Sequence, residues 1–150
     1  DWSADDLTGM INDAGLENHI DLHVKPSNSE ISQLISRCSM FASASEFEGF
    51  GLAVVEAMSA GLLPVLHNNP TFEDLVAKHR PLGLCDFSDA KKAADMVQSK
   101  FASLMQSNGA IRSDMMTRAQ TYSWSAVSQN YNQAYDEALN VAHTEFLQTS

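Results

Sequence analysis

The chain is poor in basic residues and in cysteine. It has 9 lysines and arginines against 19 aspartates and glutamates, which gives a formal net charge of -10. A surface with this balance repels nucleic acid and anionic lipid, so we expect neither as a direct partner of the chain. Only Cys38 and Cys85 are present. Two cysteines cannot build a disulfide framework, and we expect unpaired thiols in a reducing compartment.

Several motifs of other protein classes are missing. No apolar run approaches the roughly 20 residues of a membrane-spanning helix. The five histidines show no H-E-x-x-H spacing and no G-x-S-x-G sequence occurs, so we expect neither a zinc site nor a serine nucleophile. Among the histidines only His67 follows a predicted strand at a ligand-binding edge, which makes it a secondary candidate.

The pattern of apolar residues predicts an α/β fold. With 150 residues, 44% of them hydrophobic, the chain fits one globular domain, residues 1–150. It begins at Asp1, and we expect a fragment of a longer protein. Helical spacing predicts helices over 3–14, 27–38, 52–60, 89–105 and 124–146, a helix capped by Thr71 that includes 72–76, and a further helix that includes 111–116. The apolar stripe of the last helix is expected to be core rather than a site. Short apolar runs predict parallel strands over 20–24, 39–44, 62–66 and 82–84.

The segment 46–65 is the most informative part of the chain. It has the order strand, loop, helix, strand, with Gly49 and Gly51 directly before the helix. A helix N-terminus preceded by glycines favours an anion, so the amides of Phe50, Gly51 and Leu52 are predicted to contact phosphate. Carboxylates would repel phosphate, but they can accept hydrogen bonds from pairs of sugar hydroxyls.

Two glutamates flank this turn. Glu48 and Glu56 are separated by seven residues and are followed by Ala57-Met58 and Gly61-x-x-Pro64-Val65. Together these residues resemble the E-x7-E signature of glycosyltransferase family 4, whose members are retaining enzymes of the GT-B fold. The resemblance covers nearly the whole chain and implies an incomplete GT-B C-terminal domain: a Rossmann-like, doubly wound parallel sheet with long C-terminal helices.

The resemblance also implies roles for individual residues. Glu48 would be catalytic and hold hydroxyls of the donor sugar, and Glu56 would hold the ribose diol, so that the two bracket a diphosphate. Gly49, Phe50, Gly51 and Leu52 would bind the donor, and Lys25, Pro26 and Ser27 are candidates for contact with the base. No metal or other cofactor is expected. Family members carry an upstream strand, helix and strand with an Arg and a Lys that neutralise the diphosphate, and an N-terminal acceptor domain, toward which their C-terminal helix packs.

The implied activity is transfer of a sugar from a UDP- or GDP-sugar, with retention at the anomeric carbon. At Asn69-x-x-Phe72-x-x-Leu75 the chain resembles polysaccharide mannosyltransferases that use GDP-mannose. The family resemblance implies bacterial polysaccharide synthesis on a lipid-linked acceptor, in the cytoplasm at the inner membrane. Membrane contact would come only through the missing half, and the fragment alone would be inactive. Two alternatives stay open: half of an NAD-binding Rossmann oxidoreductase, and a non-catalytic module that binds a nucleotide or a protein partner.

Overall fold

The computed structural model describes residues 3–148, with side chains up to residue 139. It comprises two compact units, Asp1–Arg37 and Cys38–Ser150. The assignment of residues 1–150 to one partial donor-binding domain stays a prediction.

The first unit holds two capped helices. Helix α1 spans Ala4–Asp13 and helix α2 spans Asn28–Arg37. Ser3 and Asp6 form a capping box at the start of α1. Ser27 and Glu30 form the same reciprocal hydrogen bonds at the start of α2, which confirms the predicted helix starts. Neither helix buries a residue.

The predicted strand over 20–24 is wrong. These residues adopt no regular structure, and their apolar side chains Ile20, Leu22 and Val24 are exposed. A strand needs a neighbouring strand to pair its backbone groups, and no described strand pairs with this segment. The alternation of apolar and polar residues is therefore not enough to form a strand in this segment.

The second unit is built on a parallel sheet, as predicted. Strand β1 spans Met40–Ser43, β2 spans Leu63–His67 and β3 spans Gly83–Cys85. Their order is β1-β2-β3, with Met40 opposite Leu63 and Val65 opposite Gly83. The central strand is buried except at its last residue, as expected of a strand covered on both faces.

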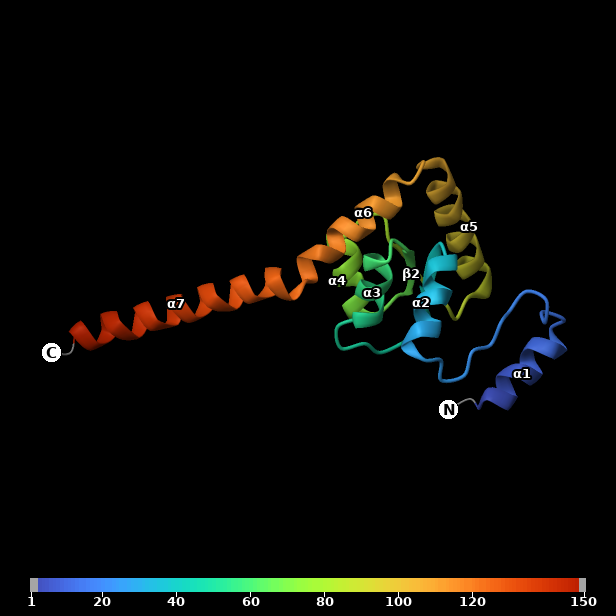
Figure 1. Cartoon of the computed structure of the whole chain (residues 1–150), viewed down its shortest axis with the longest axis horizontal. Helices are drawn as coiled ribbons and strands as arrows, with labels where there is room; N and C mark the ends of the chain where they lie inside the picture. The colour runs from blue at the N-terminus through green and yellow to red at the C-terminus, as the bar shows by residue number, and fades with distance from the viewer. Residues whose placement is uncertain (1–2, 149–150) are drawn as a thin grey trace. The chain divides into compact units, whose positions relative to one another are not determined.

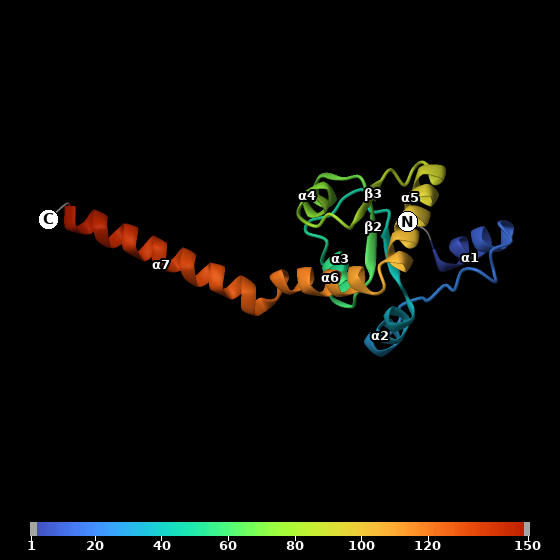
Figure 2. The ribbon, with the colours of Figure 1, turned by 90° about the horizontal axis from the view of Figure 1, so that it is seen from above.

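Helices cover both faces of this sheet. Helices α3 (Leu52–Ser59), α4 (Pro70–Lys78) and α6 (Ala110–Ala119) lie on one face, and α5 (Ala90–Gln106) lies on the other (Figures 1 and 2). This two-sided cover confirms the α/β fold class. The main hydrophobic cluster consists of Val54, Met58, Leu63, Leu66, Phe72, Leu75, Leu82, Leu104, Met115 and Ala119.

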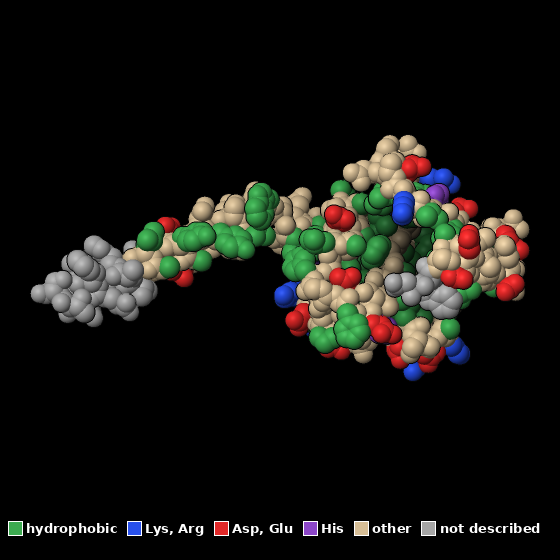
Figure 3. Space-filling model, turned by 90° about the horizontal axis from the view of Figure 1, so that it is seen from below, with side chains coloured by type: hydrophobic (Ala, Val, Ile, Leu, Met, Phe, Trp, Pro, Cys, Tyr) green, Lys and Arg blue, Asp and Glu red, His purple; other side chains and the backbone are tan. Residues whose placement is uncertain are grey.

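The chain continues through a short 3-10 helix, η1 (Gln120–Tyr122), into α7 (Trp124–Gln148). The sequence predicted that the aromatic stripe of this last helix is core. That prediction is wrong for its described side chains, because Trp124 is 80% exposed and Tyr131, Tyr135 and Leu139 are exposed as well. Figure 3 shows apolar side chains along the helix surface. The predicted stripe residues Ala142 and Phe146 lie outside the described side chains.

Two further expectations concern thiols and membranes. Cys38 and Cys85 are both free, as predicted, and burial raises the pKa of the Cys85 thiol. Across residues 3–148, no helix combines the length and apolar content that crossing a bilayer demands.

Candidate functional site

The glycine turn at residues 49–51 lies directly before α3. Gly51 is the N-cap of that helix and has a left-handed backbone, with φ of 84°, and it offers no side chain to cap the first turn. Among residues 3–148, no protein acceptor receives a hydrogen bond from the backbone N–H groups of Phe50, Gly51 or Leu52. Unpaired amides at the positive end of a helix dipole can receive an anion. The turn predicted from the sequence therefore has the required donors in place.

Glu48 lies immediately before this turn and is half-buried. It lines a cavity of about 320 Å³ together with Gly49, the exposed Phe47 and the segment 69–71 at the start of α4. The Thr71 hydroxyl donates a hydrogen bond of 2.7 Å to the Glu48 carbonyl oxygen. The backbone of Glu48 is thus held by the next βα junction, while its carboxylate is left without a hydrogen-bond partner within the described residues.

Asn69 is a second anchor of the same loop, and sequence reasoning missed its role. Thr71 was predicted to cap α4, but the cap is Asn69, whose side-chain oxygen accepts from the Phe72 N–H at 2.9 Å. Its side-chain amide donates to the Ser45 carbonyl at 2.8 Å. The signal was present in the Asn69-Pro70 pair, since proline is favoured at the first helical position after a cap. Because Asn69 caps the helix, the Thr71 hydroxyl is free to bind the Glu48 backbone, a contact that the predicted Thr71 cap excluded.

Glu56 lies on the second turn of α3 and is exposed. It lines a different cavity, of about 330 Å³, with Ser59 on α3 and Gln120 and Ser123 near η1. The two glutamates of the motif therefore do not share one hollow. A ligand that reaches both must extend across the first turn of α3, a rise of about 6 Å from Leu52 to Glu56 at roughly 1.5 Å per residue. An elongated ligand fits this layout better than a compact one.

The remaining predicted site residues lie elsewhere. Lys25, Pro26 and Ser27 belong to the first unit, where Ser27 caps α2 and Lys25 has a positive φ of 50°. Their proposed contact with the base stays a prediction. His67, the secondary candidate, is engaged in the loop after β3, because its Nδ1 accepts from the Phe87 N–H at 3.1 Å.

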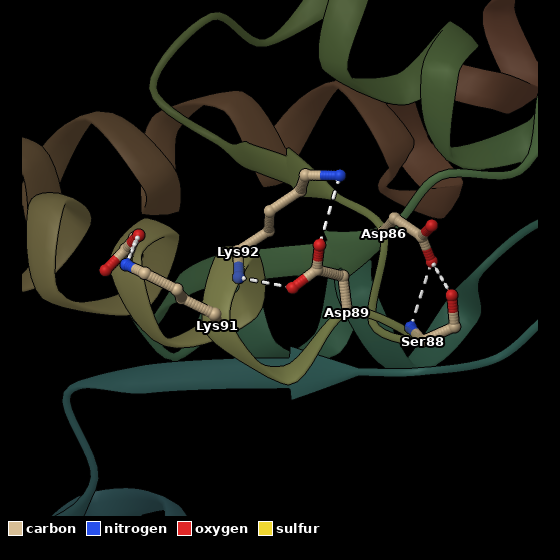
Figure 4. A network of polar contacts seen from close by, with 6 residues as sticks. Asp86, Ser88, Asp89, Lys91 and Lys92 are labelled. Carbon is tan, nitrogen blue, oxygen red and sulfur yellow. Dashed lines mark hydrogen bonds and ion pairs between the residues drawn. The ribbon is translucent and has the colours of Figure 1, made fainter.

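The junction between β3 and α5 forms a self-contained polar network (Figure 4). Asp89 caps α5 and pairs with Lys92 at 3.1 Å, and Lys91 pairs with Asp95 at 3.0 Å. Hydrogen bonds from Ser88 hold the pKa of Asp86 below its ordinary value. Both lysines are matched by carboxylates, so this junction contributes no net positive charge that would attract a phosphate.

Metal binding finds no support in the described residues. No three His, Cys, Asp or Glu side chains within the described part of the chain are arranged to hold an ion. The expectation that the reaction needs no metal remains a prediction.

Comparison with known proteins identifies the family. Residues 3–120 match the family described as "Glycosyl transferases group 1". The chain belongs to this family. It is 33% identical over 143 residues, 95% of the chain, to a GDP-mannose:cellobiosyl-diphosphopolyprenol alpha-mannosyltransferase of Komagataeibacter xylinus, and 32% identical over 145 residues, 97% of the chain, to the enzyme of that name from Xanthomonas campestris. These alignments cover 36% and 38% of the two relatives, so the chain spans little more than a third of their length.

A solved structure confirms the fold of this glycosyltransferase family member. Sucrose-phosphate synthase from Thermosynechococcus elongatus superposes with a TM-score of 0.73 at 18% sequence identity, over 90% of this chain and 34% of that enzyme. At this identity the likeness bears on the fold alone. It confirms the GT-B assignment predicted from the E-x7-E segment.

Proposed function

We propose that this glycosyltransferase chain binds a nucleoside diphosphate sugar and belongs to a retaining enzyme of family 4. The donor is a UDP- or GDP-sugar, and the names of the relatives from Komagataeibacter and Xanthomonas support GDP-mannose. The same names support an acceptor sugar attached to a diphosphopolyprenol. The proposed location of the reaction is the cytoplasmic face of a membrane. The enzyme would then act in polysaccharide synthesis.

One observation carries the proposal. The amides of Phe50, Gly51 and Leu52 have no protein acceptor among the described residues, and a carboxylate lies on each side of them. A nucleotide sugar has the same order of groups: sugar hydroxyls, then phosphates, then a ribose diol. Glu48 would accept hydrogen bonds from the sugar hydroxyls, the turn amides would bind the diphosphate, and Glu56 would accept hydrogen bonds from the ribose diol. This assignment also explains why the two glutamates line separate cavities.

The chemistry asked of these residues is electrostatic. The bond from the anomeric carbon to the diphosphate oxygen breaks, and the acceptor oxygen bonds to the same carbon from the same face. The acceptor hydroxyl proton passes to the departing diphosphate. The turn amides stabilise the charge that develops on that leaving group, and Glu48 orients the sugar. No protein nucleophile and no metal takes part.

The proposed partner is a further part of a longer enzyme. Two surfaces of the second unit support this. The outer edge of β1 pairs with no other described strand, and the α7 residues Tyr131, Tyr135 and Leu139 expose an apolar surface. An acceptor-binding domain that covers α7, and an upstream segment with basic residues beside the turn, would complete the site. Without those basic residues we expect weak donor binding and no transfer by this chain alone.

The proposal is tested by titrating GDP, UDP and NAD against the chain in a calorimeter. A nucleoside diphosphate should bind, and Glu56→Ala should weaken it at least tenfold, because hydrogen bonds to a charged group are worth about 1.5–3 kcal/mol and about 1.4 kcal/mol is tenfold. Glu73→Ala is the matched control, since Glu73 is an exposed glutamate on α4. EDTA should leave the affinity unchanged.

The other outcomes are equally informative. Binding of NAD alone would indicate half of an oxidoreductase. No binding of any of the three would favour a non-catalytic module. Equal losses from Glu56→Ala and Glu73→Ala would show that the motif glutamate has no special role. Retention is tested on an active enzyme that contains this chain, by NMR of the anomeric coupling in the product.

A further inference from the structure

The glycine turn has one aromatic contact to a distant part of the chain. The Phe50 ring, 51% exposed, meets the Tyr122 ring edge-on, with ring centroids 5.7 Å apart and planes at 75°. Such T-shaped pairs are worth about 0.5–1.5 kcal/mol beyond the area they bury. Tyr122 belongs to η1, which follows α6, so the turn before α3 is contacted by a residue some 70 positions later in the sequence.

Tyr122 is itself held in place. Its hydroxyl lies 2.7 Å from Nε2 of His79, and the two rings are also edge-on, with centroids 5.6 Å apart. His79 ends α4 and is only 6% exposed. Burial, with Arg118 and Lys78 nearby, lowers the pKa of His79, whereas Asp114 acts in the opposite sense. A neutral imidazole can accept a hydrogen bond at Nε2, so the tyrosine has a stable partner near neutral pH.

Tyr122 lines two cavities near the glycine turn. One is the cavity of Glu56, and the other is a smaller cavity of about 190 Å³ with Gly49 and Phe50. The other anchors of the loop hold its earlier part: Asn69 binds Ser45, and Thr71 binds Glu48. The aromatic contact reaches Phe50, one of the three turn residues whose amides are predicted to contact phosphate.

We infer that Tyr122, fixed by His79, is a positioning residue that holds Phe50 and thereby aims the turn amides at the donor diphosphate. This inference rests on the proposed function for its ligand, but the positioning can be measured without one. It assigns a role in the site to the segment η1, which lies outside the E-x7-E motif.

Tyr122→Phe tests the hydrogen bond while keeping the ring. We expect ¹⁵N relaxation to show lower order parameters for the backbone of residues 49–52, falling from about 0.85 toward 0.6. The affinity for GDP should fall about threefold to tenfold, whereas the affinity for guanosine, which lacks phosphates, should stay the same. Tyr135→Phe is the matched control, because Tyr135 is 67% exposed on α7. A purely structural role would change the stability without changing the ratio of the two affinities.

Two further substitutions make the result specific. His79→Leu removes the partner of the hydroxyl and should reproduce the effect of Tyr122→Phe. His79→Gln places an amide near the position of Nε2 and should restore most of the order and affinity. Phe50→Leu removes the aromatic contact with Tyr122 from its other side. Because Phe50 is half exposed, this variant should fold, and it should lower the order parameters in the same way.

Each outcome decides the inference. Reduced order at the turn together with a reduced preference for GDP over guanosine supports it. Unchanged order parameters in both Tyr122→Phe and Phe50→Leu overturn it. If the wild-type chain binds GDP, an unchanged preference for GDP over guanosine in Tyr122→Phe overturns it as well. If the wild-type chain binds neither GDP nor UDP, the proposed function fails, and the order parameters alone decide the positioning.

Discussion

Gly51→Ala should destabilise the chain strongly, for two reasons that can be separated. The backbone of Gly51 is left-handed, with φ of 84°, which costs an alanine about 1–2 kcal/mol. A Cβ added there would lie 3.1 Å from Cε1 of Phe72, a fully buried ring that has little room to move. Overpacking of this kind costs about 1–3 kcal/mol more. We therefore expect a loss of about 2–5 kcal/mol in the free energy of unfolding, measured by urea denaturation with circular dichroism.

Two other glycines provide matched controls. Gly109 has the same φ of 84° with open space around its Cβ position, so Gly109→Ala should show the backbone cost alone, about 1–2 kcal/mol. Gly49 has neither a positive φ nor a close neighbour, so Gly49→Ala should change stability little. A loss at Gly51 no greater than the loss at Gly109 would refute the tight contact with Phe72. The cost of Gly51→Ala should be smaller when it is measured in a Phe72→Leu background, as the difference between the double variant and Phe72→Leu alone.

Three further predictions concern the anchors of the site. The pKa of His79 is lowered in the folded chain, so its contribution to stability is complete above about pH 6.5 and is lost as the pH falls through the folded value. His79→Gln should therefore flatten the dependence of the urea midpoint on pH between about 7 and 5. Asn69→Ala removes a helix cap and a loop bond and should lower the unfolding free energy by about 1–3 kcal/mol in the same assay. Thr71→Val should leave calorimetric GDP binding intact but weaken GDP-mannose binding, because it releases Glu48; equal effects on both ligands would contradict this.

The elements that carry the candidate site were predictable because their signals are local. The apolar run after Gly51 and the left-handed stop at Gly61 delimit α3 within one residue of its observed end. Strand β2 is a short apolar run between turns, and the structure buries it as expected. In each case the residues that give the signal lie within the element or directly beside it.

The failures have a different cause. The segment 20–24 and the stripe on α7 both have the right periodicity, yet their side chains are exposed. Periodicity shows which residues need cover, but it does not show whether a covering element is present. For Leu22 that element would be a paired strand, and for Tyr131 it would be a packed surface, and neither is present among the described residues.

The residues of the candidate site could be proposed from the sequence, but the contacts that hold them in place could not. Glu48, Gly51 and Glu56 could be chosen because their types and spacing carry a mechanism. Their anchors act over long distances in the sequence: Asn69 binds a loop 24 residues earlier, Thr71 binds one 23 residues earlier, and His79 meets Tyr122 across 43 residues. Each anchor is a polar or aromatic residue at the end of a helix, where local reasoning assigns it to capping or to solvent. Two elements, α4 with its caps and η1, therefore constrain one loop. The substitution Tyr122→Phe in η1 should lower donor affinity about threefold to tenfold, although η1 lies outside the motif.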